Sequence, residues 1–160
     1  MFGTVSDYMV SQGLKLNDDK SHLLHFKNTK ARTEAELEVV LITPLGVIKP
    51  SEKEKFLGGI VQQDLKWTGH VINDKDNLVS ALNKRCNALK MLSKVASFKT
   101  RKSVANGLFM GKLTYLIGVW GGTTSGNLNA LQRIQNRAAR LVTRNWKAST
   151  VENLKAIGWL

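Results

Sequence analysis

The apolar residues in the second half of the chain recur every three or four positions, and this spacing limits the possible folds more than any other feature. The first such face, from Asn77 onward, comprises Leu78, Ala81, Leu82, Cys86, Leu89, Leu92 and Val95. A period of about 3.6 residues is typical of an amphipathic helix that buries one side. The sequence therefore predicts a helix here that packs against other elements.

Further helices are expected after this one. Thr100 can cap a second helix that runs to about Trp120, is apolar on most sides and should be the buried member of the group, with Gly121 and Gly122 at its end. A third helix is marked by Leu128, Leu131, Ile134, Ala138, Leu141 and Val142. With a short fourth helix around residues 151–157, these elements predict a three- to four-helix bundle joined by short loops.

The first part of the chain has short strand-like runs between turn residues. Residues 4–12 should form the end of a helix that Gly13 closes, and strands are expected at 23–26, 37–42 and 56–61, with turns at Pro44 and Pro50. Gly58 and Gly59 inside the last strand indicate a bulge or a close backbone approach. The chain should therefore be α+β, with a small antiparallel strand region in residues 1–70 and the helical bundle in residues 71–160.

Charge is divided unevenly between the two halves. Residues 1–80 contain ten Lys and Arg against eleven Asp and Glu, whereas residues 81–160 contain fourteen against Glu152 alone. A surface of one sign works against compactness, so an unmixed basic half indicates a polyanionic partner. We favour nucleic acid over an anionic membrane face as that partner.

Four arginines on the third helix form what we call the arginine row. Arg133, Arg137, Arg140 and Arg144 are spaced by four, three and four residues, opposite the apolar face. At about 1.5 Å of rise per residue the row is roughly 16 Å long, so it can contact several successive phosphates of one strand. The alternative is an ordinary solvated face, but such faces gain from Glu–Lys pairs and this helix has no acid. The other cations expected to contact nucleic acid are Lys84, Lys90, Lys94, Arg101 and Lys102.

The sequence offers no complete catalytic or metal site. Asp18 and Asp19 are adjacent, but they lie in a polar turn cluster without the rigid strands that a two-metal site requires. The three histidines, His22, His25 and His70, share no metal-ligand spacing with Cys86, which falls on an apolar helix face and should be a small buried hydrophobe. We expect no metal ligands and no small-molecule substrate.

Cysteine content and hydropathy bear on the cellular setting. One cysteine cannot form an internal disulfide, no charged-then-apolar leader opens the chain, and no apolar run approaches the roughly 20 residues that span a bilayer. The expected setting is intracellular, in the nucleus or cytoplasm, without secretion or membrane contact.

Several segments, in order along nearly the whole chain, resemble the reverse transcriptases of non-LTR (LINE-type) retrotransposons. They are GLKLNDDKS (13–21) followed by LLHF, FLGG (56–59) with DLKWTGH (64–70), FKTRK (98–102), KLTYLIGVWGG (112–122), LQRIQNRAARLVT (131–143) and GWL (158–160). The arginine-containing segment is the most specific of them. The resemblance implies that residues 1–70 are the C-terminal edge of a palm with a primer-grip hairpin, and that residues 71–160 are a thumb that holds the template–primer duplex.

The resemblance also implies roles for individual residues. Lys20 matches a lysine near the incoming nucleotide that protonates the departing pyrophosphate, although a solvated turn lysine is the alternative. The primer grip corresponds to Phe56, Leu57, Gly58 and Gly59.

The same resemblance limits what this chain can do alone. In the full enzyme, palm aspartates hold two Mg²⁺ ions, and the sequence starts after the point where those aspartates should lie. We therefore expect no cofactor and no polymerase activity from this chain alone. A stand-alone nucleic-acid-binding module and a non-functional retroelement relic are the alternative interpretations.

Overall fold

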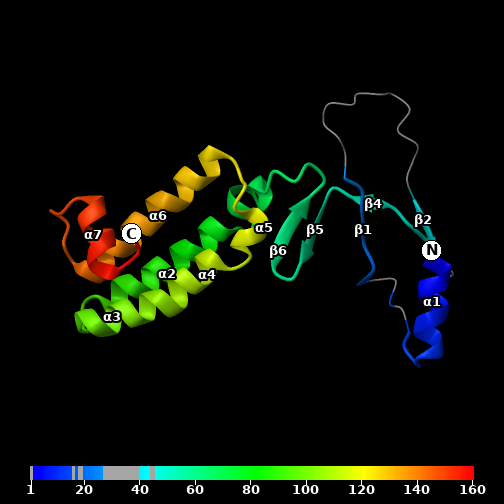
Figure 1. The fold of residues 1–160 in the computed structure, drawn as a ribbon, viewed down its shortest axis with the longest axis horizontal. Coiled ribbons are helices and arrows are strands. Elements are labelled where there is room, and N and C mark those ends of the chain that lie inside the picture. Colours follow the sequence, from blue (N-terminus) through cyan, green and yellow to red (C-terminus); the bar gives the residue numbers. More distant parts are fainter. Residues whose placement is uncertain (1, 16, 18–19, 27–39, 44–45) are drawn as a thin grey trace. The chain divides into compact units, whose positions relative to one another are not determined.

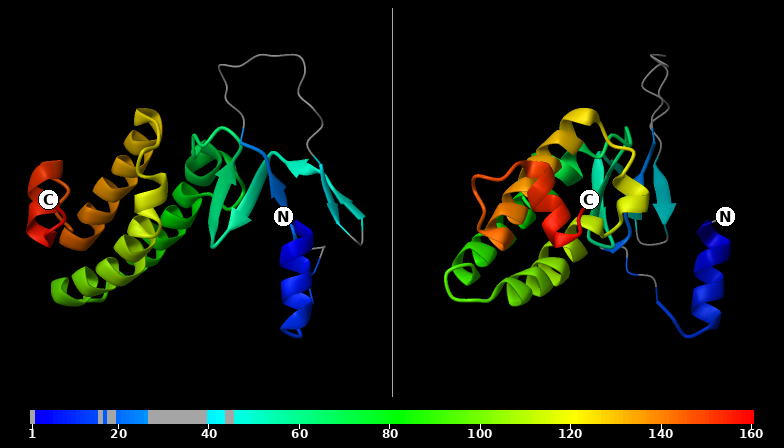
Figure 2. Two further views of the ribbon diagram at one scale, coloured as in Figure 1. Left: turned by 45° about the vertical axis from the view of Figure 1, so that its right-hand side comes forward. Right: turned by 60° about the vertical axis from the view of Figure 1, so that its left-hand side comes forward.

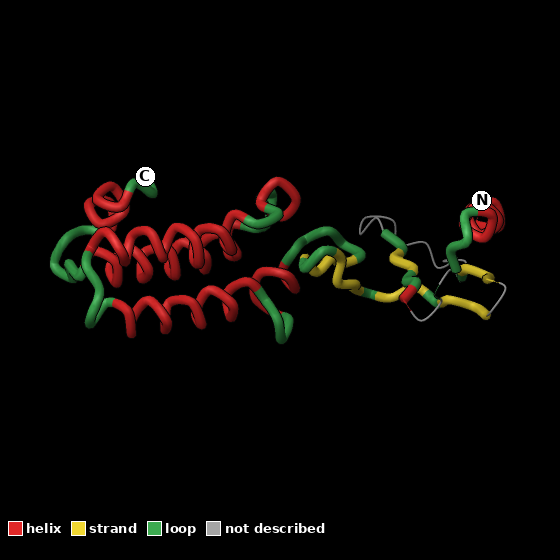
Figure 3. Tube along the Cα trace, turned by 90° about the horizontal axis from the view of Figure 1, so that it is seen from below, coloured by secondary structure: helices red, strands yellow, loops and turns green. Residues whose placement is uncertain are grey.

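A computed structural model of the chain describes residues 2–15, 17, 20–26, 40–43 and 46–160. It divides into two compact units, Met1–Leu65 and Lys66–Leu160. The strands belong to the first unit and most of the helical residues to the second (Figure 3). The division lies slightly before the expected boundary at residue 70, and Trp67, between the two, packs against the core of the helical unit.

The described residues of the first unit form one α-helix and three small strand pairs (Figure 1). The helix is α1 (Phe2–Ser11), and Gly13 follows it at φ +71°, as expected for a C-terminal cap. The pairs are β1 (Leu23–Leu24) with β4 (Pro50–Ser51), β2 (Leu41–Thr43) with β3 (Gly46–Ile48), and β5 (Lys53–Phe56) with β6 (Gly59–Gln62). The first pair is parallel and the other two are antiparallel, so the antiparallel pairing that was expected is accompanied by one parallel pair.

The predicted strand at 56–61 is instead a hairpin. β5 ends at Phe56 and β6 begins at Gly59, with Leu57 and Gly58 as a two-residue turn at φ +48° and +78°. Two positive φ values characterise the type I′ turn, whose twist matches that of the flanking strands. Gly58 therefore serves a chain reversal and not a bulge, and Gly59 begins β6 opposite Phe56. The strand expected at 23–26 is represented by the shorter β1. β2 overlaps the strand expected at 37–42, of which residues 37–39 lie outside the described part, as do Asp18, Asp19 and Pro44.

The helical unit contains all the helices that were expected, with one of them broken. Its elements are η2 (Gly69–Asn73), α2 (Leu78–Leu92), α3 (Phe98–Ala105), η3 (Asn106–Met110), α4 (Gly111–Thr114), α5 (Ile117–Trp120), α6 (Ser125–Thr143) and α7 (Thr150–Ile157), where η2 and η3 are π-helical turns. α2 packs against α6, and α7 packs back onto the C-terminal part of α6 (Figure 2). Most residues of the predicted apolar faces of α2 and α6 form the core. Ala81 and Leu92 are only half-buried, and Val95, beyond the end of α2, and Leu128 are exposed.

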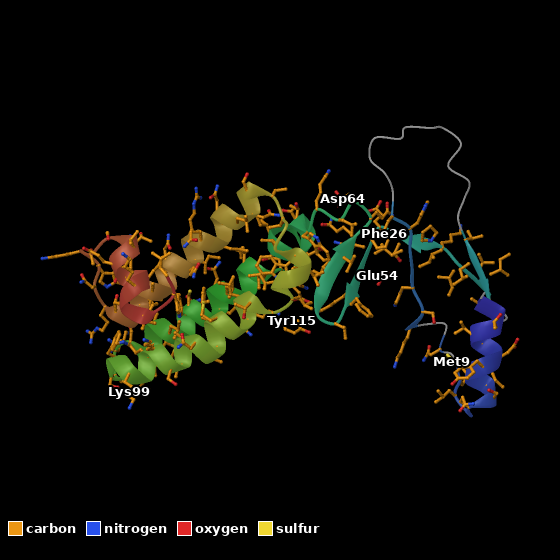
Figure 4. The ribbon with its side chains drawn as sticks, viewed as in Figure 1. Met9, Phe26, Glu54, Asp64, Lys99 and Tyr115 are labelled. Atoms are coloured by element: carbon orange, nitrogen blue, oxygen red, sulfur yellow. The ribbon has the colours of Figure 1, made fainter. Side chains whose placement is uncertain are left out.

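The second predicted helix differs most from expectation. Ser97 caps α3, not Thr100, because the Ser97 hydroxyl accepts the Thr100 N–H at 3.2 Å and Thr100 is already inside the helix. The helix then breaks at Leu116, whose φ of +57° lies in the left-handed region, and the Trp120 indole donates to the freed Tyr115 carbonyl at 2.8 Å. Figure 4 shows the Tyr115 side chain projecting from this break. The segment is also not buried on most sides, because Ile117 and Val119 are exposed.

The spacing of the buried residues around η3 explains its π-helical turn. Arg101, Ala105, Phe109 and Leu113 are the buried residues of this segment and follow one another at intervals of four. In an α-helix of about 3.6 residues per turn, each such step drifts by roughly 40° around the axis. A wider π turn absorbs this drift, so the four side chains stay on the core side.

Candidate nucleic-acid interface

A groove of about 320 Å³ lies on the helical unit, at the C-terminal ends of α2 and α6. Its lining consists of Lys90, Ser93, Lys94, Arg137, Arg140, Leu141, Arg144 and Trp146. We call it the basic groove, because five of these eight side chains are cationic and none is acidic.

Helix direction brings the cations together. α2 and α6 pack side by side and run the same way (Figure 1), so their last turns are neighbours. Cys86 lies between them, fully buried, with its sulfur 4.0 Å from the Ile134 carbonyl oxygen. Arg144 takes the left-handed conformation at φ +58° just after α6 and turns the chain out of the helix beside the groove.

The predicted binding residues other than Arg101 divide into three groups. The first group lines the basic groove and consists of Lys90, Lys94, Arg137, Arg140 and Arg144. The sequence alone could not show that cations from two helices meet there. Arg133 and Lys84 are exposed on α6 and α2 but do not line it. Lys102 is half-buried on α3, also outside the lining.

Arg101 was wrongly assigned to the binding surface. Its side chain is 7 % exposed, its Nε donates to the Val142 carbonyl oxygen at 2.7 Å, and its Nη1 donates to the Ala96 carbonyl oxygen at 2.6 Å. Val142 lies in the last turn of α6, where carbonyl groups lack helical partners and the helix dipole favours a cation. Arg101 therefore joins the start of α3 to the end of α6 and is a structural residue.

Helix dipoles account for only part of the charge in the groove. Each helix C-terminus is equivalent to roughly −0.5 charge, so two of them offset about one of the five cations. None of these five side chains forms an ion pair with a carboxylate in the described part of the chain. The groove therefore retains a large positive surplus, which is what an anionic ligand would neutralise.

The arginines of the groove also keep unused hydrogen-bond donors. Arg137 donates from Nη1 to the Asn83 side-chain oxygen at 3.4 Å, and Arg140 from Nη2 to the Thr150 hydroxyl at 3.3 Å. The Arg140 Nε is buried and has no partner among the described residues. A guanidinium has five N–H donors in a planar fork suited to phosphate oxygens, so most of this capacity remains available.

Sequence reasoning missed Trp146, Ser93 and Leu141 in the lining. Trp146 is 62 % exposed and follows directly after the arginine row. Its neighbours make the segment Arg144-Asn145-Trp146-Lys147, an aromatic residue among basic ones. That pattern is typical of surfaces that bind single strands, and it could have been recognised in the sequence.

Burial shifts the pKa values of two groups in the helical unit. Burial, and secondarily the charge of Lys112, lowers the pKa of His70, whose ring centre lies 6.4 Å from that of Trp120. Burial raises the pKa of the Cys86 thiol, against a smaller opposite effect of Arg137. Neither environment resembles that of a reactive nucleophile, and no three His, Cys, Asp or Glu side chains gather as metal ligands within the described ranges.

The residues assigned from the family resemblance lie in the first unit. Lys20 is exposed in a turn, where its backbone N–H donates to the Asn17 carbonyl oxygen at 3.1 Å. Phe56 and Leu57 are each 67 % exposed at the tip of the β5–β6 hairpin, next to the exposed Gly58, whereas Gly59 is buried. The basic groove belongs to the other unit.

Among the helices that the structure describes, none combines the length and apolarity needed to cross a membrane. Comparison of the chain with protein-family models, with curated proteins and with solved structures gave no match.

Proposed function

We propose that the helical unit binds the sugar-phosphate backbone of nucleic acid in the basic groove. The supporting observation is the convergence of five cations from two helices on one groove, without an ion-paired carboxylate among the described residues. Like charges at such short range are unfavourable unless a polyanion neutralises them. Binding would then release condensed counterions and depend steeply on salt.

The family resemblance extends this proposal to the whole chain, as the C-terminal piece of a non-LTR retrotransposon reverse transcriptase. The most specific matching segment, residues 131–143, lies within α6 and supplies Arg137 and Arg140 to the groove. The FLGG segment forms the tip of a hairpin, as the primer grip would require. On this proposal the helical unit is the thumb, and Lys20 and the hairpin act only together with the rest of a palm that holds Mg²⁺.

A salt titration tests the backbone-binding proposal. The full chain would be titrated into a fluorescein-labelled 12-base-pair DNA duplex, with anisotropy recorded between 50 and 300 mM salt. Each phosphate contact contributes about −0.9 to the slope of log K against log salt, so replacing Arg137, Arg140 and Arg144 by Gln should flatten the slope by roughly 2–3.

A charge-matched variant controls for net charge. Lys75, Lys99 and Lys155 are exposed and lie outside the groove lining, and Figure 4 shows Lys99 projecting from the start of α3. Their triple replacement by Gln should change the slope by less than about 1. Equal slopes for the two triple variants would remove the groove from the proposal. Thermal unfolding of each variant shows whether it is folded at the titration temperature.

Two further measurements address the family proposal. Primer extension on a primed RNA template should give no incorporation by this chain alone, and detectable incorporation would contradict that expectation. The genomic DNA upstream of the Met1 codon should continue in frame through apolar residues and a pair of aspartates. Stop codons there would favour a retroelement relic instead.

The alternative of a stand-alone binding module has one observation in its favour. The core cluster runs from Val71 to Ile157, so the helical unit has its own hydrophobic core. The same salt titration applies to it, because the groove lies wholly in that unit.

A further inference from the structure

The position of Trp146 is not explained by packing. Its side chain is 62 % exposed, and it is absent from the core cluster and from the apolar residues packed against that cluster. An indole left in water forgoes the large burial gain that aromatic side chains usually obtain. It nevertheless lines the basic groove together with Arg140 and Arg144.

The loop that contains Trp146 is fixed by hydrogen bonds from the buried Asn153 side chain. Asn153 is 2 % exposed, and its side-chain amide donates to the carbonyl oxygens of Asn145, Ala148 and Ser149 at 3.1, 3.2 and 3.0 Å. The Asn145 side chain in turn accepts the Ala148 N–H at 3.1 Å, which closes a turn around Trp146 and Lys147.

Both ends of this loop are fixed as well. The Asn145 N–H donates to the Thr143 hydroxyl at 3.2 Å, and a reciprocal capping box between Ser149 and Glu152 starts α7. An exposed aromatic ring on a loop so constrained is preorganised, as a ligand platform should be.

The size of the groove and the exposed ring together limit the ligand. A volume of about 320 Å³ is at the lower end of the roughly 300–1,000 Å³ typical of small-ligand sites, so it suits one nucleotide unit better than the width of a duplex. In a duplex, each base is stacked between its neighbours and offers no free face to an indole. In a single strand, the bases can turn outward and stack on aromatic side chains while the phosphates contact cations.

We propose that the basic groove binds single-stranded nucleic acid in preference to duplex, with phosphates on Arg137, Arg140 and Arg144 and one base stacked on Trp146. This inference rests on the proposed backbone binding alone and adds the strand state of the ligand to it. It differs from the family proposal, in which a thumb holds a template–primer duplex. Because every base has an aromatic face, the stacking is tolerant of sequence, and the groove should take pyrimidine and purine strands alike.

The experiment compares three probes of equal length with the full chain at one salt concentration. They are a fluorescein-labelled dT 12-mer, a 12-mer with the same backbone and abasic sites, and the 12-base-pair duplex of dT with dA. Stacking of one base is expected to make the dT strand bind between about five- and one hundred-fold more tightly than the abasic strand. Trp146→Ala should remove this factor and leave abasic binding unchanged.

Two conservative variants separate stacking from simple apolar contact. Trp146→Phe should keep most of the preference for the dT strand, whereas Trp146→Leu should behave like Trp146→Ala. Saturation with the dT strand should quench tryptophan fluorescence in the wild type, and Trp146→Phe should lose most of that quenching.

The possible results separate base stacking on Trp146 from backbone binding in the basic groove. If the abasic strand or the duplex binds as tightly as the dT strand, or if Trp146→Ala weakens all three probes equally, the stacking inference is overturned while backbone binding stands. If no probe binds, or if the same probes titrated between 50 and 300 mM salt show no salt dependence, backbone binding is overturned and the inference with it.

Discussion

Arg101 provides the sharpest test of the structural assignments, because sequence and structure disagree about it. Arg101→Met keeps the length of the side chain but removes its donors. Hydrogen bonds from a charged group contribute about 1.5–3 kcal/mol each, and Arg101 makes two, at 2.7 and 2.6 Å to backbone carbonyl oxygens. Relief of the buried charge offsets part of this sum. We therefore expect the free energy of unfolding to fall by about 3 kcal/mol.

The assay is urea unfolding followed by circular dichroism at 222 nm, which reports mainly on the helical unit. With a denaturant dependence of about 2 kcal/mol per molar urea, the midpoint should fall by roughly 1.5 M at an unchanged slope. The matched control is Lys99→Met, which removes the same charge from the exposed side of α3 and should change stability by less than about 0.5 kcal/mol.

Binding by the folded fraction completes this test. The buried Arg101 guanidinium donates to a carbonyl group at the end of α6 and should make no ligand contact. Folded Arg101→Met should therefore bind the dT strand about as well as Lys99→Met does. If Arg101→Met proves as stable as the wild type but loses binding, the assignment from burial is refuted and the assignment from sequence is restored.

Three further predictions concern buried polar groups. Asn153→Ala should lower the free energy of unfolding by about 2–3 kcal/mol in urea, because the buried Asn153 amide makes several hydrogen bonds to carbonyl groups of the Trp146 loop that alanine cannot make; a change below about 0.5 kcal/mol would contradict this. Since the pKa of His70 is lowered in the folded state, the unfolded chain takes up the proton more readily below about pH 6.5, and stability should fall as pH falls through that value. His70→Gln should flatten this dependence in pH-dependent thermal melts, and parallel curves would refute the reasoning. The Cys86 thiol, buried and with a raised pKa, should react with a disulfide reagent only in urea; rapid reaction of the native chain would contradict its burial.

The sequence predicted the elements whose signals are local. α2, α6 and α7 lie where their apolar spacing indicated, because one buried face per helix suffices to specify them. The break at Leu116 was not predictable, since Leu is a good helix former and its left-handed φ depends on tertiary packing and on the Trp120–Tyr115 hydrogen bond. The strands were poorly predicted because runs of two to four residues hold too little periodic signal.

The candidate site was predictable only along one helix. The spacing of the arginines placed them on one side of α6, but the arrival of Lys90 and Lys94 beside them depends on how α2 packs. Arg101 and Lys102 are adjacent in sequence and equally basic, and nothing local distinguishes the buried residue from the partly exposed one. The hydrogen bonds of Asn153 were also not predictable from the sequence, because a buried polar residue is recognised by its partners and not by its type.

The π-helical turn in η3 determines where the chain could change in length. Removing one residue there, such as the exposed Gly107, would leave the core positions of this segment at intervals of four, three and four, which an ordinary α-helix places on one side. The same deletion in the middle of α6 would rotate everything after it by roughly 100° and carry Arg140 and Arg144 away from Lys90 and Lys94. Shortening is therefore compatible with the bundle at η3, while α6 must keep its residue count.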